Sequence, residues 1–202
     1  MQGGVDVYHI TTSIYLFSLF VTTILAQSQE LKVTISASKD VYSSAEEIQV
    51  RIGYENVGER SILLWPSFVP HVPETGWPDT YLEFLIQDTS GNRVPVDGGS
   101  LKGMYSEDPT PAMFTVLQPG EFFGFHLELG KGLYRHAFND IEGEYIIEAV
   151  AHFRVWEWMN ERLESDEKRD KTASYLYDRR DMLVRGTIKS NKISVRVAPK
   201  AR

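Results

Sequence analysis

The chain has 202 residues, of which 42% are hydrophobic, 12% aromatic and 24% charged, with 15 Gly, 9 Pro, no Cys and a formal net charge of −7. The apolar fraction is too high for a disordered chain, Gly and Pro are too few for a fibrous one, and the lack of Cys excludes disulfide scaffolds, thiolate metal sites and cysteine nucleophiles. A chain of this length is expected to form one globular domain.

The first element in chain order is an uncharged, mostly apolar stretch at residues 10–26, which ends where polar residues begin at Gln27. Its length and the small Ala26 at its end are typical of a secretory signal peptide. The preceding segment contains Asp6 and no basic residue, and Ile24 is bulky for a cleavage site, so an uncleaved N-terminal anchor is the alternative. In both cases we expect the rest of the chain to be secreted or to lie in the periplasm or cell envelope.

The charge of the chain limits the classes of partner. Residues 1–26 contain one acidic residue and no basic one, so the remainder carries a net charge of −6. Lys and Arg are interleaved with Asp and Glu, whereas binding to a nucleic-acid backbone requires a concentrated basic surface. We therefore expect no nucleic-acid partner, and membrane contact only if the N-terminal segment is retained.

From residue 31 onward, apolar residues alternate with polar ones, which is the pattern of half-buried β-strands. This alternation predicts strands at residues 33–35, 48–54, 61–65, 80–88, 123–129, 145–153 and 193–197. Turn signals such as Gln118-Pro119-Gly120 separate them. Seven to nine short strands of this kind, without helices between them, predict an all-β, antiparallel sandwich over residues 31–198.

A segment rich in proline and aromatic residues, residues 65–78, interrupts the strand pattern. Its four prolines keep the chain extended and reduce the entropy lost on binding, and its flat rings are suited to contact a sugar or a peptide. The candidate ligand-binding residues are Trp65, Phe68, His71 and Trp77. Packing in the core is the alternative for both tryptophans.

A charged insertion at residues 157–185 separates the last two predicted strands. Glu164 and Lys168 have the spacing of an ion pair that supports a helix, so we expect the insertion to be partly helical, with a disordered loop as the alternative. Trp156 and Trp158 have the spacing of residues on one face of a strand. We expect them to anchor the base of the insertion.

Five short motifs follow one another along the chain. They are Asp40-Val41-Tyr42, Ile48-x-Val50-x-Ile52-x-Tyr54-x-Asn56-x-Gly58, Leu117-Gln118-Pro119-Gly120-Glu121, Gly143-Glu144-Tyr145-Ile146-Ile147-Glu148-Ala149 and Ser190-Asn191-Lys192-Ile193. This series resembles secreted bacterial immunoglobulin-like modules, and similar patterns occur in the intracellular proteinase inhibitor family and in non-catalytic domains of extracellular peptidases. The resemblance implies an immunoglobulin-like β-sandwich and, by analogy only, proteinase inhibition.

Residues that could carry chemistry are few. His126 and His152 fall at polar positions of predicted strands, and no G-x-S-x-G nucleophile motif is present. The closest approach to a metal-binding pattern is His71, Glu74 and Asp79, whose spacing does not aim the ligands at one point without a helix. We therefore expect no enzymatic activity and no cofactor.

These patterns favour a non-catalytic recognition module that binds an extracellular protein or polysaccharide through loops at one end of the sandwich. The predicted binding surface is residues 65–78, helped by the insertion at 157–185. Two alternatives remain open. One is a proteinase inhibitor that presents a rigid loop to a protease cleft, and the other is a metal-dependent hydrolase that uses His71, Glu74 and Asp79.

Overall fold

The computed structural model describes residues 30–44, 46–65, 69–70, 80–94, 110–129, 142–164 and 171–199.

One sheet of the protein consists of three strands in which buried and exposed residues alternate. These strands, β1 (Leu31–Ala37), β3 (Ile48–Asn56) and β8 (Phe122–Leu129), pair antiparallel in the order β1-β3-β8. Ile52 is paired with Ile35 on one side and with Phe125 on the other. The apolar positions of the three strands therefore share one face of this sheet.

The second sheet has five strands, β2 (Val41–Ser43), β5 (Val69–Pro70), β6 (Thr80–Asp88), β9 (Gly143–Phe153) and β10 (Gly186–Ala198), in the order β2-β10-β9-β6-β5. The β-rich architecture predicted from the alternation is confirmed. The prediction of antiparallel pairing throughout is wrong at the two edges of this sheet, because β2 runs parallel to β10 and β5 parallel to β6.

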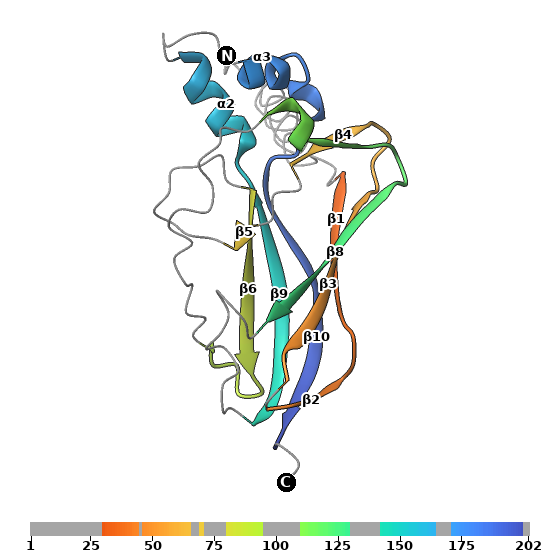
Figure 1. Cartoon of the computed structure of the whole chain (residues 1–202), viewed down its shortest axis with the longest axis vertical. Helices are drawn as coiled ribbons and strands as arrows, with labels where there is room; N and C mark the ends of the chain where they lie inside the picture. Colours follow the sequence, from red (N-terminus) through yellow and green to blue (C-terminus); the bar gives the residue numbers. More distant parts are fainter. Residues whose placement is uncertain are drawn as a thin grey trace, which may run out of the picture.

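The main hydrophobic core lies between these two sheets (Figure 1). Each sheet contributes large side chains that are almost fully buried, among them Tyr54 from β3, Phe84 from β6 and Phe153 from β9. The rings of Tyr54 and Phe153 meet edge to face with centroids 6.3 Å apart, so aromatic contacts join the two layers directly. Burying one such side chain is worth about 1.5–3 kcal/mol, and this interior is the principal source of stability.

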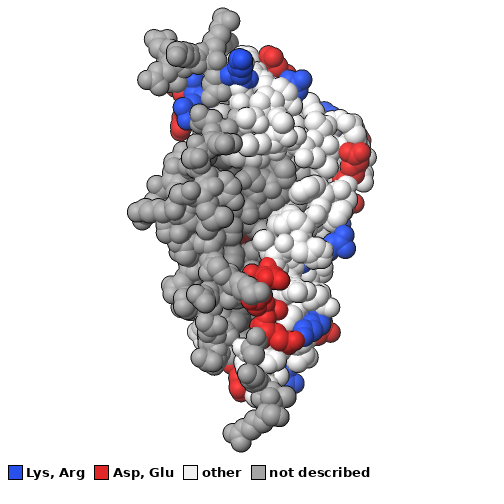
Figure 2. All heavy atoms as spheres, in the orientation of Figure 1, with Lys and Arg blue, Asp and Glu red and all other residues white. Residues whose placement is uncertain are grey.

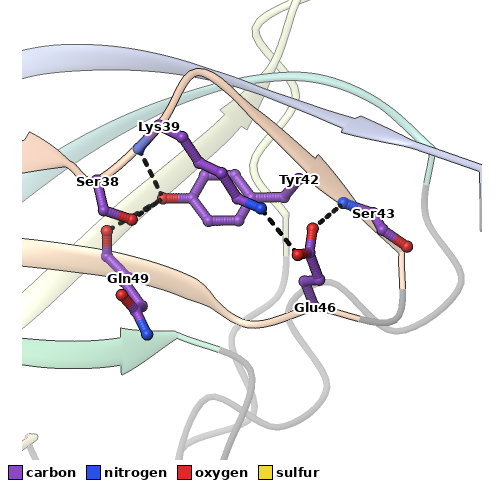
Figure 3. A network of polar contacts seen from close by, with 6 residues as sticks. All are labelled: Ser38, Lys39, Tyr42, Ser43, Glu46 and Gln49. Atoms are coloured by element: carbon purple, nitrogen blue, oxygen red, sulfur yellow. Dashed lines mark hydrogen bonds and ion pairs between the residues drawn. The ribbon is translucent and has the colours of Figure 1, made fainter.

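The chain crosses from the first sheet to the second between β1 and β2, and Tyr42 secures this crossing (Figure 3). Its ring is buried, and its hydroxyl donates to the carbonyl of Gln49 at 3.2 Å and accepts from the backbone N–H of Lys39 at 3.3 Å. Nearby, the Glu46 carboxylate accepts from the backbone N–H of Ser43 at 2.6 Å and from Lys39 Nζ at 2.8 Å. The hydrogen bond from Lys39 is the main cause that lowers the pKa of Glu46.

A small two-stranded sheet extends the first sheet toward one end of the molecule. β4 (Ile62–Leu64) pairs antiparallel with β7 (Thr115–Leu117), which is preceded by the 3₁₀ turn η1 (Pro111–Met113). Asn56 is the last residue of β3, just before the turn that leads to β4, and it is fully buried. This extension leads the chain to the end of the molecule that carries the helices (Figure 1).

The insertion between β9 and β10 contains two helices, α2 (Val155–Glu164) and α3 (Lys171–Tyr177), and the 3₁₀ turn η3 (Arg180–Met182). We call these three elements the helical cap. They lie at one end of the sheets, with β2 at the other (Figure 1). The placement of Trp156 and Trp158 on a strand face is wrong, because both residues lie in α2.

None of the helices among the described residues is both long and apolar enough to cross a bilayer. The predicted signal peptide or anchor, residues 1–26, lies outside the described residues.

Candidate functional site

A second hydrophobic core holds the helical cap on the end of the sheets. In α2 the buried residues Val155, Trp158 and Met159 follow helical spacing, and Leu176 of α3 faces the same core. Leu63, Trp65 and Leu183 complete it, and Leu63 and Leu183 also form an isolated parallel bridge. The cap is therefore joined to β4 by packing and by backbone pairing.

Trp65 is the one predicted ligand-binding residue that lies among the described residues. It is 9% exposed, and its ring lies 5.8 Å from that of Phe114, which in turn lies 6.4 Å from Tyr175 of α3. Three segments far apart in the sequence thus meet through aromatic contacts. The structure places Trp65 in the second core, where it supports the cap and the start of the segment at residues 65–78.

The remaining residues predicted to bind a ligand or a metal lie outside the described residues. These are Phe68, His71, Glu74, Trp77 and Asp79. Among the described residues, no group of three His, Asp or Glu side chains is arranged to hold a metal ion.

Three arginines that follow α3 in the chain each cover an aromatic ring of the helical cap. The guanidinium of Arg185 lies 3.4 Å from the ring centroid of Trp156, that of Arg179 lies 4.0 Å from Tyr175, and that of Arg180 lies 4.7 Å from Tyr177. The residues of this arginine surface are Arg179, Arg180 and Arg185 with Trp156, Tyr175 and Tyr177. Such cation–π contacts restrict the arginine rotamers and fix where the charges lie.

Each arginine of this surface is also held by a backbone carbonyl near the end of α3. Arg179 donates to the carbonyl of Tyr175 at 3.3 Å, Arg180 to that of Tyr177 at 3.1 Å, and Arg185 to that of Arg180 at 3.3 Å. The carbonyls of Tyr175 and Tyr177 lie in the last turn of α3, where carbonyls lack partners within the helix, which explains the first two contacts. The last bond also places the head of Arg185 beside the backbone of Arg180.

Part of this surface could have been found from the sequence. Tyr175 and Arg179 are four residues apart and Tyr177 and Arg180 three, which are the spacings at which side chains meet on a helix. No such spacing indicates the contact of Arg185 with Trp156. These residues are far apart in the sequence, and they meet only because the chain just before β10 packs beside α2.

A separate polar cluster lies on the second sheet around His152. The imidazole Nδ1 lies 3.1 Å from the Thr187 hydroxyl, and Nε2 lies 3.5 Å from a carboxylate oxygen of Glu83. This order of hydroxyl, imidazole and carboxylate is also that of the catalytic triad in serine hydrolases. The nearer partner of Glu83, however, is Arg93 at 2.6 Å, which neutralises the carboxylate that would have to support the imidazole as a base.

We expect this cluster to make stability depend on pH. Burial lowers the pKa of His152 in the folded protein, and Arg154 adds to this, while Glu83 opposes it. The unfolded chain therefore takes up the proton more readily, so the free energy of unfolding should fall on acidification from about pH 7.5 to about pH 5.5. The difference in stability between the wild type and His152→Gln, measured by urea unfolding at each pH, should shrink over this range. A difference that is independent of pH would contradict the assignment.

No family model matches the chain, and a search of curated proteins returns no significant match.

Proposed function

We propose that this chain is a non-catalytic recognition module of the immunoglobulin-like type, which acts outside the cell or in its envelope. It binds a protein or polysaccharide through the end of the sandwich that carries the helical cap. The arrangement of strands, the position of Trp65 and the composition of the cap surface each support part of this proposal.

The strand order supports the immunoglobulin-like assignment. In such sandwiches, strands A, B and E share one sheet and strands C, F and G the other. The order β1-β3-β8 corresponds to A-B-E, and β6, β9 and β10 occupy the positions of C, F and G as neighbours in the second sheet. In immunoglobulin-like domains the loops gather at the two ends of the sheets, where they are free to vary and to bind.

The observation that carries the functional proposal is the burial of Trp65 in the core of the helical cap. Trp65 begins the segment rich in proline and aromatic residues, and the cap is the body of the charged insertion. Because Trp65 packs into this small core, the start of the segment lies at the same end of the molecule as the cap. This position supports a recognition surface at the end of the molecule that carries the cap.

The absence of cysteine allows a direct test. A single introduced cysteine is a unique attachment point for a bulky polymer. Leu163→Cys places it on α2 of the cap, where the residue is 42% exposed, and Val41→Cys places it on β2 at the opposite end, where the residue is 50% exposed. The two labelled proteins are then compared with the wild type on arrays of extracellular proteins, proteases and polysaccharides.

Polymer attached at residue 163 should weaken binding to any array partner by at least about tenfold, while polymer at residue 41 should leave it unchanged. Unlabelled cysteine variants control for the substitutions themselves. The proposal is wrong if the polymer blocks binding only at residue 41, or if the wild type binds nothing on the arrays. Stoichiometric inhibition of a protease on the array would favour the inhibitor alternative.

A further inference from the structure

We infer that the arginine surface of the helical cap binds a carboxylate-rich segment of a partner protein. This inference rests on the proposed function and specifies the chemistry of the ligand. It is carried by three observations: the arginines are close in sequence and all donate to carbonyls of residues 175–180, they are held in place before binding, and no carboxylate of the described residues lies within ion-pair distance of them.

The arginines are held more firmly than solvent-exposed arginines usually are. Arg180 and Arg185 are exposed, yet each has its guanidinium over a ring and one N–H bonded to a carbonyl. An exposed arginine loses rotamer entropy when it is fixed, and here the fold has already fixed it. Binding an anion therefore costs less entropy at this surface than at a mobile arginine.

Carbonyl contacts at the end of α3 use only part of the capacity of these side chains. A guanidinium has five N–H donors, and each arginine uses one of them on a backbone carbonyl. The planar fork that remains matches the two oxygens of a carboxylate. Elsewhere in the described structure, exposed cations such as Arg60, Arg93 and Lys32 are paired with glutamates. Among the described carboxylates, none forms such a pair with the arginine surface.

The aromatic rings of this surface argue for carboxylate recognition over stacking of neutral sugars. One side of each of Trp156, Tyr175 and Tyr177 is occupied by a guanidinium. A sugar ring would have to displace the arginine to stack on that side. A carboxylate can instead bind to the edge of the stacked guanidinium without disturbing the ring.

Charges around the surface favour a short acidic peptide segment over a long polyanion. Asp178 and Asp181 are exposed beside the arginines, and Figure 2 shows basic and acidic side chains side by side at the helical end. The whole chain carries a net charge of −7. Repulsion between the acidic residues of the chain and an anionic ligand is screened beyond about 8 Å at physiological ionic strength. A short segment with a few carboxylates at the arginines therefore avoids this repulsion, whereas a continuous polyanion experiences it along its whole length.

The test measures binding of three probes to the full chain by fluorescence anisotropy. The probes are a fluorescein-labelled oligoglutamate peptide, an oligoglutamine peptide of the same length and an oligogalacturonate. The variants are the triple Arg→Gln protein at positions 179, 180 and 185, and the corresponding triple Arg→Lys protein. Arg51→Gln is the matched control, because Arg51 is also an exposed arginine 5.6 Å from an aromatic ring, Phe122, but lies on the first sheet. Circular dichroism and thermal unfolding verify that each variant is folded.

We expect oligoglutamate to bind the wild type and oligoglutamine not to bind. The triple Arg→Gln variant should weaken oligoglutamate binding by at least about tenfold, triple Arg→Lys should restore it only in part, and Arg51→Gln should have no effect. The inference is overturned if the peptide binds the triple Arg→Gln variant as well as the wild type, if oligogalacturonate binds more tightly than the peptide, or if the triple substitution instead dissolves a dimer of the chain. Array partners that are blocked by polymer at residue 163 but unaffected by triple Arg→Gln would refute this inference alone and leave the proposed function intact.

Discussion

Replacing Met159 by alanine should lower the free energy of unfolding by about 2–5 kcal/mol, the range for truncating a large buried side chain. Met159 is fully buried in the second core, which also contains Trp65, Leu176 and Leu183. Because this core is small, the cavity left by the substitution has few neighbouring groups that could collapse into it. Urea unfolding of the variant measures the loss.

The same substitution should also show where the cap is held. We expect hydrogen exchange of Met159→Ala to speed up in α2 and α3 while the centres of β9 and β10 stay protected, because the main core between the sheets is untouched. Leu163→Ala in the same helix is the control. Leu163 is 42% exposed, so its loss should change stability by no more than about 0.5 kcal/mol. A Met159→Ala protein as stable as this control would show that the second core does not exist as described.

Replacing Asn56 by alanine should cost about 2–5 kcal/mol, because its fully buried side chain bonds three backbone groups, and the Leu117 carbonyl among them is buried as well. Asn56 Nδ2 donates to the carbonyls of Arg60 at 2.8 Å and Leu117 at 2.9 Å, and Oδ1 accepts from the N–H of Gly58 at 3.0 Å. The side chain is fully buried and ties the turn before β4 to the end of β7. Alanine cannot replace any of these hydrogen bonds.

Asn92→Ala provides the comparison for this prediction. Asn92 also donates through its side chain, to Asp88 at 2.9 Å, but it lies in an exposed turn where water can take over the bond. Its loss should change the free energy of unfolding by less than about 1 kcal/mol. If Asn56→Ala and Asn92→Ala were equally mild in urea unfolding, the Asn56 side chain would not be the tie between these turns.

The strands of the main core could be predicted because their physical signal is local. Ile48, Val50, Ile52 and Tyr54 alternate with polar or small residues, and all four are buried in β3. The parallel edge strands could not be predicted in this way, since β2 and β5 contain three and two residues and are too short for a periodicity. Their pairing depends on where the chain crosses between the sheets, which Tyr42 secures through tertiary hydrogen bonds.

The helical cap shows how two periodicities can compete in a short segment. Trp156 and Trp158 alternate like strand residues, but the spacing of Val155, Trp158 and Met159 is that of a buried helix face. The insertion itself contains few apolar residues, because part of its core is contributed by residues outside the insertion, Leu63 and Trp65. The candidate arginine surface follows from this packing, so only its pairs that are three or four residues apart carried a signal in the sequence.

The central claim is that Trp65 and the helical cap share one core at one end of the molecule. Nuclear Overhauser effects between ring protons test it directly, because the Trp65 and Phe114 rings are 5.8 Å apart between centroids and the Phe114 and Tyr175 rings 6.4 Å. We predict cross-peaks from Trp65 to Phe114 and from Phe114 to Tyr175 in the assigned spectrum. Assigned rings without these cross-peaks, in a protein whose strands are intact, would contradict the claim.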